Sequence, residues 1–188
     1  RIDSFKINTV MRIISGSHKG RRLTAPKGLP VRPTTDFAKE GLFNMLHHRF
    51  ALHDVGVLDL YAGTGNIAYE FGSRGAQSIT CVDQHAACCH FIDQTAAQLD
   101  LPITAVRSEV TKFLERHSGQ YDIVFADPPY DYPKKDLFLL IDRICDGSFL
   151  NQDGLLIIEH TKDHDLTDHP NFNEARRYGG SVFSYFSN

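Results

Sequence analysis

The stretch from Val57 to Asn66 constrains the fold more than any other part of the chain. An apolar run, interrupted by Asp59, is followed almost at once by Gly63 and Gly65. Glycines allow a sharp turn and let the backbone approach a ligand without a Cβ in the way. The stretch therefore predicts a buried strand, a tight turn and a helix that begins near Asn66, where free backbone N–H groups can meet a ligand.

Two features of this stretch point to different cofactors. The spacing Gly63-x-Gly65-x-x-Ala68, with Asp83 about 20 residues further on, fits the loose dinucleotide pattern. Asp59, however, stands four residues before Gly63, where dinucleotide enzymes keep an apolar residue. A buried carboxylate is costly unless it meets a cation or hydrogen-bond donors, and the α-amino group of S-adenosylmethionine supplies both. Asp59 therefore favours a methyl donor, while a strand–turn–helix unit without a ligand stays open as an alternative.

A second anchor is Asp127-Pro128-Pro129-Tyr130, which follows an apolar strand predicted over residues 121–126. Two consecutive prolines exclude helix and fix an extended, rigid turn. Such a turn presents a carboxylate, a backbone carbonyl and an aromatic ring in fixed geometry. These groups can accept hydrogen bonds from an exocyclic amino group and stack on its base.

From residue 55 onward, predicted strands and helices alternate. Alternation with apolar strands indicates parallel βαβ units covered on both faces. The last two strands flank Gly179-Gly180, a hairpin signal, so the final strand is expected to run antiparallel to its neighbours. The predicted strands lie near 56–61, 78–83, 103–107, 121–126, 154–159, 173–178 and 181–186, and the helices near 66–74, 85–99, 110–117 and 134–146.

The charge of the chain is unevenly distributed. Residues 1–35 contain eight of the 20 Lys and Arg residues but one of the 23 acids. Strand-like pieces at 12–15 and 21–24 predict a hairpin with a flexible tip, and a helix with an apolar core face follows from about residue 36. A basic arm on an acidic body suggests a polyanion partner, although a solvated basic hairpin is the alternative. The candidate phosphate contacts are Arg12, Lys19, Arg21, Arg22 and Arg32.

Three segments divide the chain in this interpretation. Residues 1–10 precede Met11, a natural start, and are expected to be an added leader. Residues 11–54 form the basic hairpin and helix, and residues 55–188 form the cofactor-binding domain.

Acids at the ends of predicted strands are candidate ligand contacts, because ligands of open α/β sheets bind at the carboxyl edge. Asp83 ends the second strand and could bind two ribose hydroxyls, or else cap the following helix. Glu109 follows the third strand and could meet an adenine amino group, or else serve as a cap or surface charge. The same reasoning does not decide the roles of Glu159 and His160.

Cysteine usage and hydropathy restrict the cellular compartment in which the protein is expected to work. The chain has four cysteines, none in a C-x-x-C pair, which favours a reduced, cytoplasmic protein without a metal centre. No apolar run approaches the roughly 18 residues of a membrane span, and no secretory leader is visible.

The residues that carry the chemistry resemble those of the Rossmann-like class I S-adenosylmethionine-dependent methyltransferases. Within that class the chain resembles the bacterial RsmD family, which methylates the N2 amino group of a guanine in 16S ribosomal RNA. The match runs from Met11 onward. Its motifs are Arg12-Ile13-Ile14-Ser15-Gly16 with Lys19-Gly20-Arg21, Arg32-Pro33-Thr34-Thr35-Asp36 with Glu40-x-Leu42-Phe43-Asn44, Asp59-x-x-Ala62-Gly63-Thr64-Gly65, and Asp127 to Tyr130.

The resemblance implies a seven-stranded, mostly parallel sheet with an antiparallel last strand, preceded by the hairpin and helix. It also implies that S-adenosylmethionine is the cofactor and 16S rRNA, within a small-subunit assembly particle, the partner. Asp127, Pro128, Pro129 and Tyr130 would hold the guanine. The cofactor would be held by Asp59, Tyr61, Ala62, Gly63, Thr64, Gly65 and Asn66, with Asp83 at the ribose and Glu109 at the adenine.

Two positions depart from the family pattern, and three other functions remain open. The family more often has Glu where Asp83 stands, and Asp within the segment that here reads Ser108-Glu109-Val110. The near rival is an amino methyltransferase that acts on DNA adenine or on another RNA or protein amine. A dinucleotide-dependent oxidoreductase and a non-catalytic RNA-binding assembly factor are alternatives from other classes.

Overall fold

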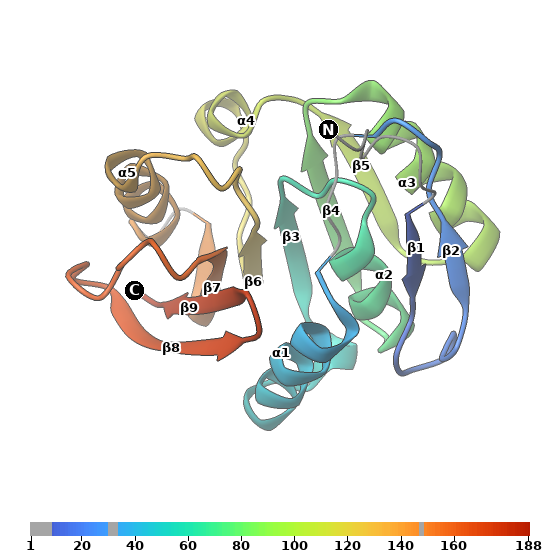
Figure 1. The fold of residues 1–188 in the computed structure, drawn as a ribbon, viewed down its shortest axis with the longest axis horizontal. Helices are drawn as coiled ribbons and strands as arrows, with labels where there is room; N and C mark the ends of the chain where they lie inside the picture. The colour runs from blue at the N-terminus through green and yellow to red at the C-terminus, as the bar shows by residue number, and fades with distance from the viewer. Residues whose placement is uncertain (1–8, 30–33, 147–148) are drawn as a thin grey trace.

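The structure is a computed structural model that describes residues 9–29, 34–146 and 149–188. Its centre is a seven-stranded sheet in the order β5-β4-β3-β6-β7-β9-β8 (Figure 1). β3 to β7 pair in parallel, and β9 runs antiparallel to both β7 and β8. The predicted fold and its antiparallel last strand are thereby confirmed. The strands are β3 (Gly56–Leu60), β4 (Ser78–Asp83), β5 (Ile103–Arg107), β6 (Tyr121–Ala126), β7 (Leu150–Thr161), β8 (Phe172–Tyr178) and β9 (Ser181–Phe186).

Helices cover both faces of this sheet and make a three-layer sandwich (Figure 1). Side chains alternate along the strands, so that Val57 packs in one core and Leu58 in the other. The first core receives α1 (Asp36–Arg49), α2 (Asn66–Ser73) and α3 (Ala86–Leu99). The second receives α4 (Val110–Arg116) and α5 (Lys134–Cys145). All of the helices expected from the periodic pattern are present, with ends within two residues of the predicted ones.

β7 is longer than the sequence pattern suggested. It starts at Leu150 rather than near residue 154, and Leu150 pairs with Tyr121 across a register irregularity that precedes Ile123. Asp153 has a φ of 62°, so the strand passes through a distortion before its regular part. The polar residues ahead of Gly154 hid this extension, because their pattern is typical of a turn.

The N-terminal hairpin consists of β1 (Val10–Arg12) and β2 (Arg22–Thr24). The prediction that its first strand spans residues 12–15 is wrong. The backbone N–H groups of Ile14 and Ser15 donate to the Glu70 carboxylate, at 2.9 and 3.0 Å, instead of to β2. Thr9 and Val10, which the sequence pattern assigned to a leader, pair with Ala25 and Thr24.

The tip of the hairpin is docked rather than free, which corrects the expectation of a flexible tip. The N–H of Ser17 donates to the carbonyl of Ser73 at 2.7 Å, and the Ser73 hydroxyl donates to the carbonyl of Ser15. A Cβ on Gly16, whose φ is 83°, would lie 1.8 Å from the Ser73 carbonyl oxygen. The tip therefore packs on the C-terminal end of α2, at the end away from the glycine turn.

Two further observations concern the helices. Thr35 caps α1 by accepting a hydrogen bond from the N–H of Ala38. Within the described residues, every helix is too short or too polar to cross a membrane.

Candidate functional site

A cavity of about 480 Å³ opens at the carboxyl edge of the sheet, where β3, β4, β5 and β6 end. It has one side near the glycine turn and another at Asp127 to Tyr130, so the structure brings the two predicted anchors together. Several other lining residues were given no role at the site from the sequence. These are Thr34, Ile67, Gln84, His85, Ser108, Val110, Thr111, Phe125 and Tyr132.

The turn after β3 has the backbone that its glycines predicted. Gly63 and Gly65 have φ values of 54° and 80°, in the region that L side chains rarely adopt. A Cβ on Gly65 would lie 2.9 Å from Cζ of Tyr69, so this glycine also lets α2 pack tightly. Tyr61 also has a positive φ, of 59°, and its hydroxyl donates to that of Tyr132 at 3.2 Å. The glycine turn is thus tied to the loop that follows Asp127.

Asp59 is the most unusual group in the cavity wall. Its side chain is 2% exposed, and its Oδ2 has no hydrogen-bond partner among the described residues. Burial raises the pKa of Asp59 to about 8, the Asp83 carboxylate adds to the rise, and a backbone hydrogen bond from Ala68 opposes it. A buried, under-satisfied carboxyl group is expensive unless a ligand completes it. The cavity therefore offers a ready partner for a cationic donor such as an amino group.

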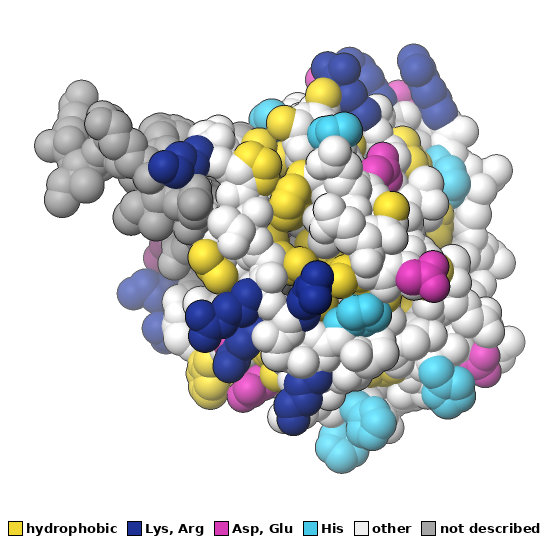
Figure 2. Space-filling view, turned by 90° about the vertical axis from the view of Figure 1, so that its right-hand side faces the viewer, with side chains coloured by type: hydrophobic (Ala, Val, Ile, Leu, Met, Phe, Trp, Pro, Cys, Tyr) yellow, Lys and Arg dark blue, Asp and Glu magenta, His cyan; other side chains and the backbone are white. Residues whose placement is uncertain are grey.

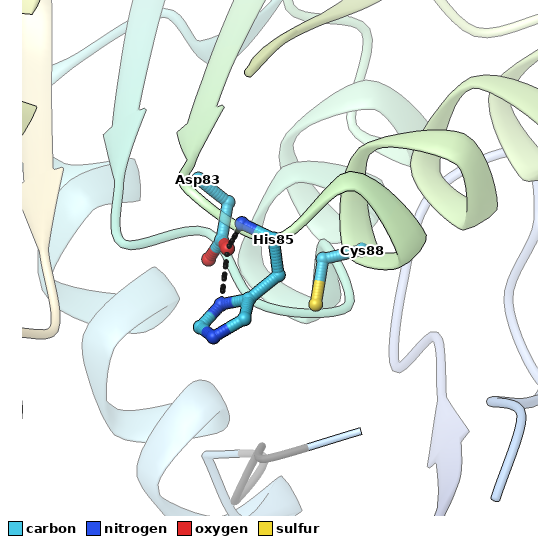
Figure 3. Close-up of side chains that lie close together, drawn as sticks. All are labelled: Asp83, His85 and Cys88. Atoms are coloured by element: carbon cyan, nitrogen blue, oxygen red, sulfur yellow. Dashed lines mark hydrogen bonds and ion pairs between the residues drawn. The ribbon is translucent and has the colours of Figure 1, made fainter. Parts of the chain in front are cut away.

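Asp83 lies at the end of β4 and is held in a fixed orientation (Figure 3). One oxygen accepts the N–H of Gly63 at 2.9 Å, and the other accepts the backbone N–H and Nδ1 of His85 at 2.8 and 2.9 Å. The carboxylate thereby joins the glycine turn to the start of α3. These three contacts leave about one of the four lone-pair sites of the carboxylate unused, on the oxygen that accepts from Gly63, and this site can accept a hydroxyl group.

Asp83 and His85 also lie close to Cys88, and the three offer metal-ligand atoms within 4.8 Å of one another. Figure 3 shows the carboxylate and imidazole facing each other, while the thiol belongs to α3. Burial raises the pKa of Cys88 to about 12, so the thiol keeps its proton at neutral pH. The hydrogen bonds of Asp83 account for this arrangement, and we assign no metal to it.

Glu109 stands just before α4 and lines the far end of the cavity. Its side chain is half exposed and forms an ion pair with Lys112 at 2.9 Å. It does not cap α4 through its side chain. The structure thus places Glu109 at the edge of the cavity as a solvated group.

The turn Asp127-Pro128-Pro129-Tyr130 is anchored at both ends on consecutive residues of the β3 segment. The N–H of Asp127 donates to the carbonyl of Leu60 at 3.3 Å, and Tyr132 hydrogen-bonds to Tyr61. Pro128 is buried, whereas Tyr130 is 41% exposed at the rim. The rigid turn predicted from the prolines is present, and it faces the same cavity as Asp59.

A second buried carboxylate, Glu70, lies in the middle of α2 and is fully paired. Besides the N–H groups of Ile14 and Ser15, it receives Nη2 of Arg74 at 3.0 Å and faces Nζ of Lys39 at 3.6 Å. Lys39 and Glu70 are 1% and 0% exposed at their side chains. Burial lowers the pKa of Lys39, and the Glu70 carboxylate opposes that shift. We call these five residues the Glu70 junction.

The junction reaches the cavity through Asn66. Nζ of Lys39 donates to the carbonyl of Arg12 at 2.6 Å and to Oδ1 of Asn66 at 3.0 Å. Nδ2 of Asn66 donates to the carbonyl of Thr34 at 2.9 Å. The side-chain amide of Asn66 is therefore engaged in joining α1 to α2, and the residue also lines the cavity, where the sequence predicted a cofactor contact. Its backbone N–H is the group that faces the ligand end of the helix.

The predicted basic residues are spread along the flank of the molecule. Lys19, Arg21 and Arg22 are exposed, and Figure 2 looks onto the flank that carries β1 and β2, where Lys and Arg side chains stand among histidines and apolar groups. Arg12 is paired with Asp36 at 2.8 Å. Arg32 lies outside the described residues.

Glu159 and His160, whose roles the sequence left open, are buried in hydrogen-bonded positions. Glu159 accepts the hydroxyls of Thr34 and Ser181, both at 2.7 Å. His160 lies between the carbonyl of Thr161 and the Ser184 hydroxyl, and burial lowers its pKa. Glu159 thus holds the cavity wall at Thr34 in place.

The strand order, the glycine turn and the acids at the carboxyl edge define a Rossmann-like class I methyltransferase fold. Among solved structures, yhhF from Escherichia coli superposes with a TM-score of 0.78 at 28% sequence identity, and the match covers 95% of this chain and 97% of yhhF. The sequence is 37% identical over 166 residues to YlbH of Bacillus subtilis, covering 84% of this chain and 86% of YlbH.

The family follows from two further matches. The family model described as Conserved hypothetical protein 95 matches residues 11–187. Ribosomal RNA small subunit methyltransferase D of Escherichia coli K12 is 31% identical over 161 residues, covering 85% of this chain and 79% of that protein. The chain belongs to the ribosomal RNA small subunit methyltransferase D family. It is therefore a methyltransferase, and the alternatives of a dinucleotide-dependent oxidoreductase and a non-catalytic assembly factor are set aside.

Proposed function

We propose that this chain transfers a methyl group from S-adenosylmethionine to the exocyclic N2 of a guanine in 16S rRNA, the guanine 966 type of modification. The small-subunit assembly particle would be its substrate, in the cytoplasm. The observation that carries the proposal is the position of Asp59 and Asp127 on one cavity: a carboxylate without a full set of partners faces a rigid amine-binding turn. The name of the Escherichia coli relative supports a small-subunit RNA substrate.

The cavity has suitable groups for each part of S-adenosylmethionine. The unpartnered Oδ2 of Asp59 would accept the amino group, next to the glycine turn at Ala62 to Gly65. The oriented carboxylate of Asp83 would accept a ribose hydroxyl, and the segment from Ser108 to Thr111, with Glu109, would surround the adenine. When bound, this cofactor supplies a methyl group on a positively charged sulfur, which is open to displacement by an amine.

The work of the protein at the amine is to orient it. The lone pair of a guanine N2 amine is delocalised into the ring, so the amine is a poor nucleophile. Hydrogen bonds from its N–H groups to the Asp127 carboxylate and the Pro128 carbonyl would direct the lone pair across the cavity. Positioning of two reactants contributes roughly 7–11 kcal/mol in well-held pairs. Asp127 can also take up the proton that the amine loses.

The base must leave its stack to enter this cavity, at a cost of a few kcal/mol. Tyr130, half exposed at the rim, would offset part of that cost by stacking on the base. The exposed cations Lys19, Arg21 and Arg22, with Arg12 and Arg32, would contact RNA phosphates, which add affinity without reading sequence.

The test is methyl transfer from labelled S-adenosylmethionine to undermethylated small-subunit particles, followed by mapping of the modified base. Asp127→Ala is expected to lose activity by roughly a hundredfold or more, the scale of removing one positioned transition-state contact. Its affinity for S-adenosylhomocysteine should stay close to that of the wild type, because Asp127 is assigned to the amine.

The matched control is Asp131→Ala, which removes an exposed carboxylate from the same loop. This variant should keep full activity. If Asp127→Ala retains near-normal turnover, or if the label lies on a base other than guanine, the proposed reaction is wrong.

A further inference from the structure

Among the described residues, four large hydrophobic side chains are classed as exposed: Val10, Phe37, Tyr130 and Leu139. Single exposed apolar side chains are ordinary on protein surfaces, so exposure alone indicates nothing. Phe37 and Leu139 are similarly exposed, at 64% and 57%, but their surroundings differ. Leu139 lies on α5, whereas Phe37 follows the cavity-lining Thr34 by three residues and packs on another aromatic ring.

The place of Phe37 follows from the hydrogen bonds around it. It stands in the first turn of α1, three residues after Thr34, which lines the cavity. Thr34 is held by Glu159, and Glu159 also holds Ser181 at the start of β9. Because Ser181 pairs with Thr161 at the carboxyl end of β7, this corner of the molecule lies at the same sheet edge as the cavity.

The ring of Phe37 packs against the ring of Tyr178. Tyr178 pairs with Ser181 across the β8–β9 turn, and its ring meets that of Phe37 edge to face, with centroids 5.8 Å apart. The contact depends on Gly41, because a Cβ there would lie 2.0 Å from Cε1 of Tyr178. The Tyr178 ring therefore packs directly on the backbone of α1. This packing fixes the ring against which the exposed side chain of Phe37 lies. We call Phe37 and Tyr178 the aromatic corner.

Positive charge lies next to the aromatic corner. Arg176 lies two residues before Tyr178, on the same face of β8, where it is exposed and paired with Glu174 at 2.9 Å. Arg12 is paired with Asp36, the residue before Phe37. Exposed aromatic rings flanked by Arg are the means by which proteins bind unpaired nucleotides, the ring stacking on a base and the cation contacting the backbone.

We propose that the aromatic corner binds an unpaired nucleobase of the RNA, next to the nucleotide that enters the cavity, by stacking on Phe37. The inference rests on the proposed function and adds a second base contact to it. Withdrawal of the target base breaks the stack in which it lay, and a neighbouring base loses a partner. The Phe37 ring, at the same edge of the sheet as the cavity, would replace the stacking partner that this neighbouring base has lost. The cavity then holds the target base while the corner fixes the strand beside it.

The chain contains no tryptophan, so a single introduced tryptophan reports on its own surroundings. Phe37→Trp preserves an exposed aromatic ring, and Leu139→Trp is the matched control on α5. Single-stranded poly(A) and small-subunit particles should each quench the fluorescence of Phe37→Trp. Duplex RNA of equal length should quench it far less, because its bases are already stacked. Leu139→Trp should show no such difference.

A second pair of variants measures the effect on the reaction. Phe37→Ala should raise the KM for particles roughly tenfold, the scale of one lost base–aromatic stack. Leu139→Ala should leave the KM unchanged, and both variants should bind S-adenosylhomocysteine like the wild type. Equal quenching by duplex and single-stranded RNA would assign the signal to charge alone and overturn the proposal. A response to particles without any response to poly(A) would assign the corner to a particle protein, with the same consequence.

Failure of the proposed function is distinguishable from failure of this inference. Wild-type protein that methylates no guanine refutes the reaction, while the fluorescence of Phe37→Trp still decides whether the corner stacks on unpaired bases. Wild-type activity together with unquenched Phe37→Trp leaves the reaction intact and removes the corner from RNA binding.

Discussion

Asp59 and Glu70 are both buried acids on the same side of the first βα unit, yet their surroundings are opposite. Glu70 meets two backbone N–H groups, an arginine and a lysine, and every one of these comes from the chain itself. Asp59 has one oxygen without a partner among the described residues, and its pKa is raised to about 8. Glu70 is fully paired within the folded protein, whereas Asp59 leaves one oxygen open to a ligand.

The difference shows how to separate a structural acid from a ligand-binding one when both are buried. Burial costs a carboxylate several kcal/mol unless hydrogen bonds and charges compensate it. Glu70 is compensated within the fold, so its removal should damage stability. Asp59 is not fully compensated within the fold, so we expect its removal to weaken ligand binding instead. Four predictions test this contrast, beginning with the largest expected effect.

Glu70→Ala should lower the free energy of unfolding by roughly 3–5 kcal/mol, because it leaves the Lys39 ammonium buried without its counterion. The N–H groups of Ile14 and Ser15 would also lose their acceptor. Urea denaturation measures the change. The double variant Lys39→Met with Glu70→Leu should recover part of the loss, since no uncompensated charge remains. Equal stability of Glu70→Ala and wild type would contradict the structural role.

Asp59→Asn should weaken S-adenosylhomocysteine binding by about 2–5 kcal/mol, the cost of truncating one partner of a buried charge pair. Calorimetry measures it. Without ligand, the variant should be as stable as the wild type near pH 4, and more stable at neutral pH and above. The reason is that the folded pKa of Asp59 lies above the unfolded value of 3.8. The unfolded chain loses that proton first, so wild-type stability falls as the pH rises from about 4 to about 8.

If Asn at position 59 left the affinity for S-adenosylhomocysteine unchanged in a folded protein, the assignment of Asp59 to the amino group would be lost. Loss of stability on the scale of Glu70→Ala would place Asp59 in the same class as Glu70 and end the contrast.

The affinity of the wild type for S-adenosylhomocysteine should depend on pH. With the pKa of Asp59 at about 8, most of these side chains are protonated at pH 7 and must release a proton to pair with an ammonium group. Affinity should therefore rise between about pH 6 and pH 7.5, by up to roughly tenfold per unit. Calorimetry in two buffers of different ionisation enthalpy should detect the released proton. Asp59→Asn should show neither effect, and a flat wild-type profile would count against the raised pKa.

The smallest effect concerns the hairpin that the Glu70 junction holds. Changing Lys19, Arg21 and Arg22 together to Ala should weaken RNA binding and flatten its log–log salt dependence by about 0.7 to 0.9 per lost phosphate contact. These side chains are exposed, so stability should change little. Affinity for S-adenosylhomocysteine should also stay unchanged. Parallel salt lines for the two proteins would mean that RNA is bound elsewhere.

Local sequence patterns sufficed for most of the fold and for the cavity acids. Glycine spacing predicted the turn after β3, and the residues at strand ends predicted Asp59, Asp83 and Asp127, because a parallel sheet aligns its carboxyl ends at one edge. The alternation of apolar residues predicted the strands themselves. In each case the information lies within a few residues of the position concerned.

The Glu70 junction could not be predicted in this way. Glu70 lies in a short helix, and its partners Ile14 and Ser15 are 56 and 55 residues away in the chain. The pattern around Ile14 was typical of a strand, and it failed because a distant carboxylate takes the backbone N–H groups. The side-chain contacts of Asn66 could not be predicted for the same reason, since its amide meets Lys39 on another helix and Thr34 just before that helix. Tertiary contacts of this kind leave no local signal.

The position of β9 in the sheet has a consequence for folding during synthesis. β9 is made after every other strand described here, yet it lies between β7 and β8, and its Phe183, Tyr185 and Phe186 are buried in the two cores. While a ribosome still holds this segment in its exit tunnel, β7 has a bare edge, and Ser181 has not reached Glu159, which holds the cavity wall. Earlier parts of a nascent chain can begin to fold during synthesis. This enzyme, however, completes its sheet and its cavity wall only after the ribosome has released its hold on β9, so a chain stalled before that point has no finished site.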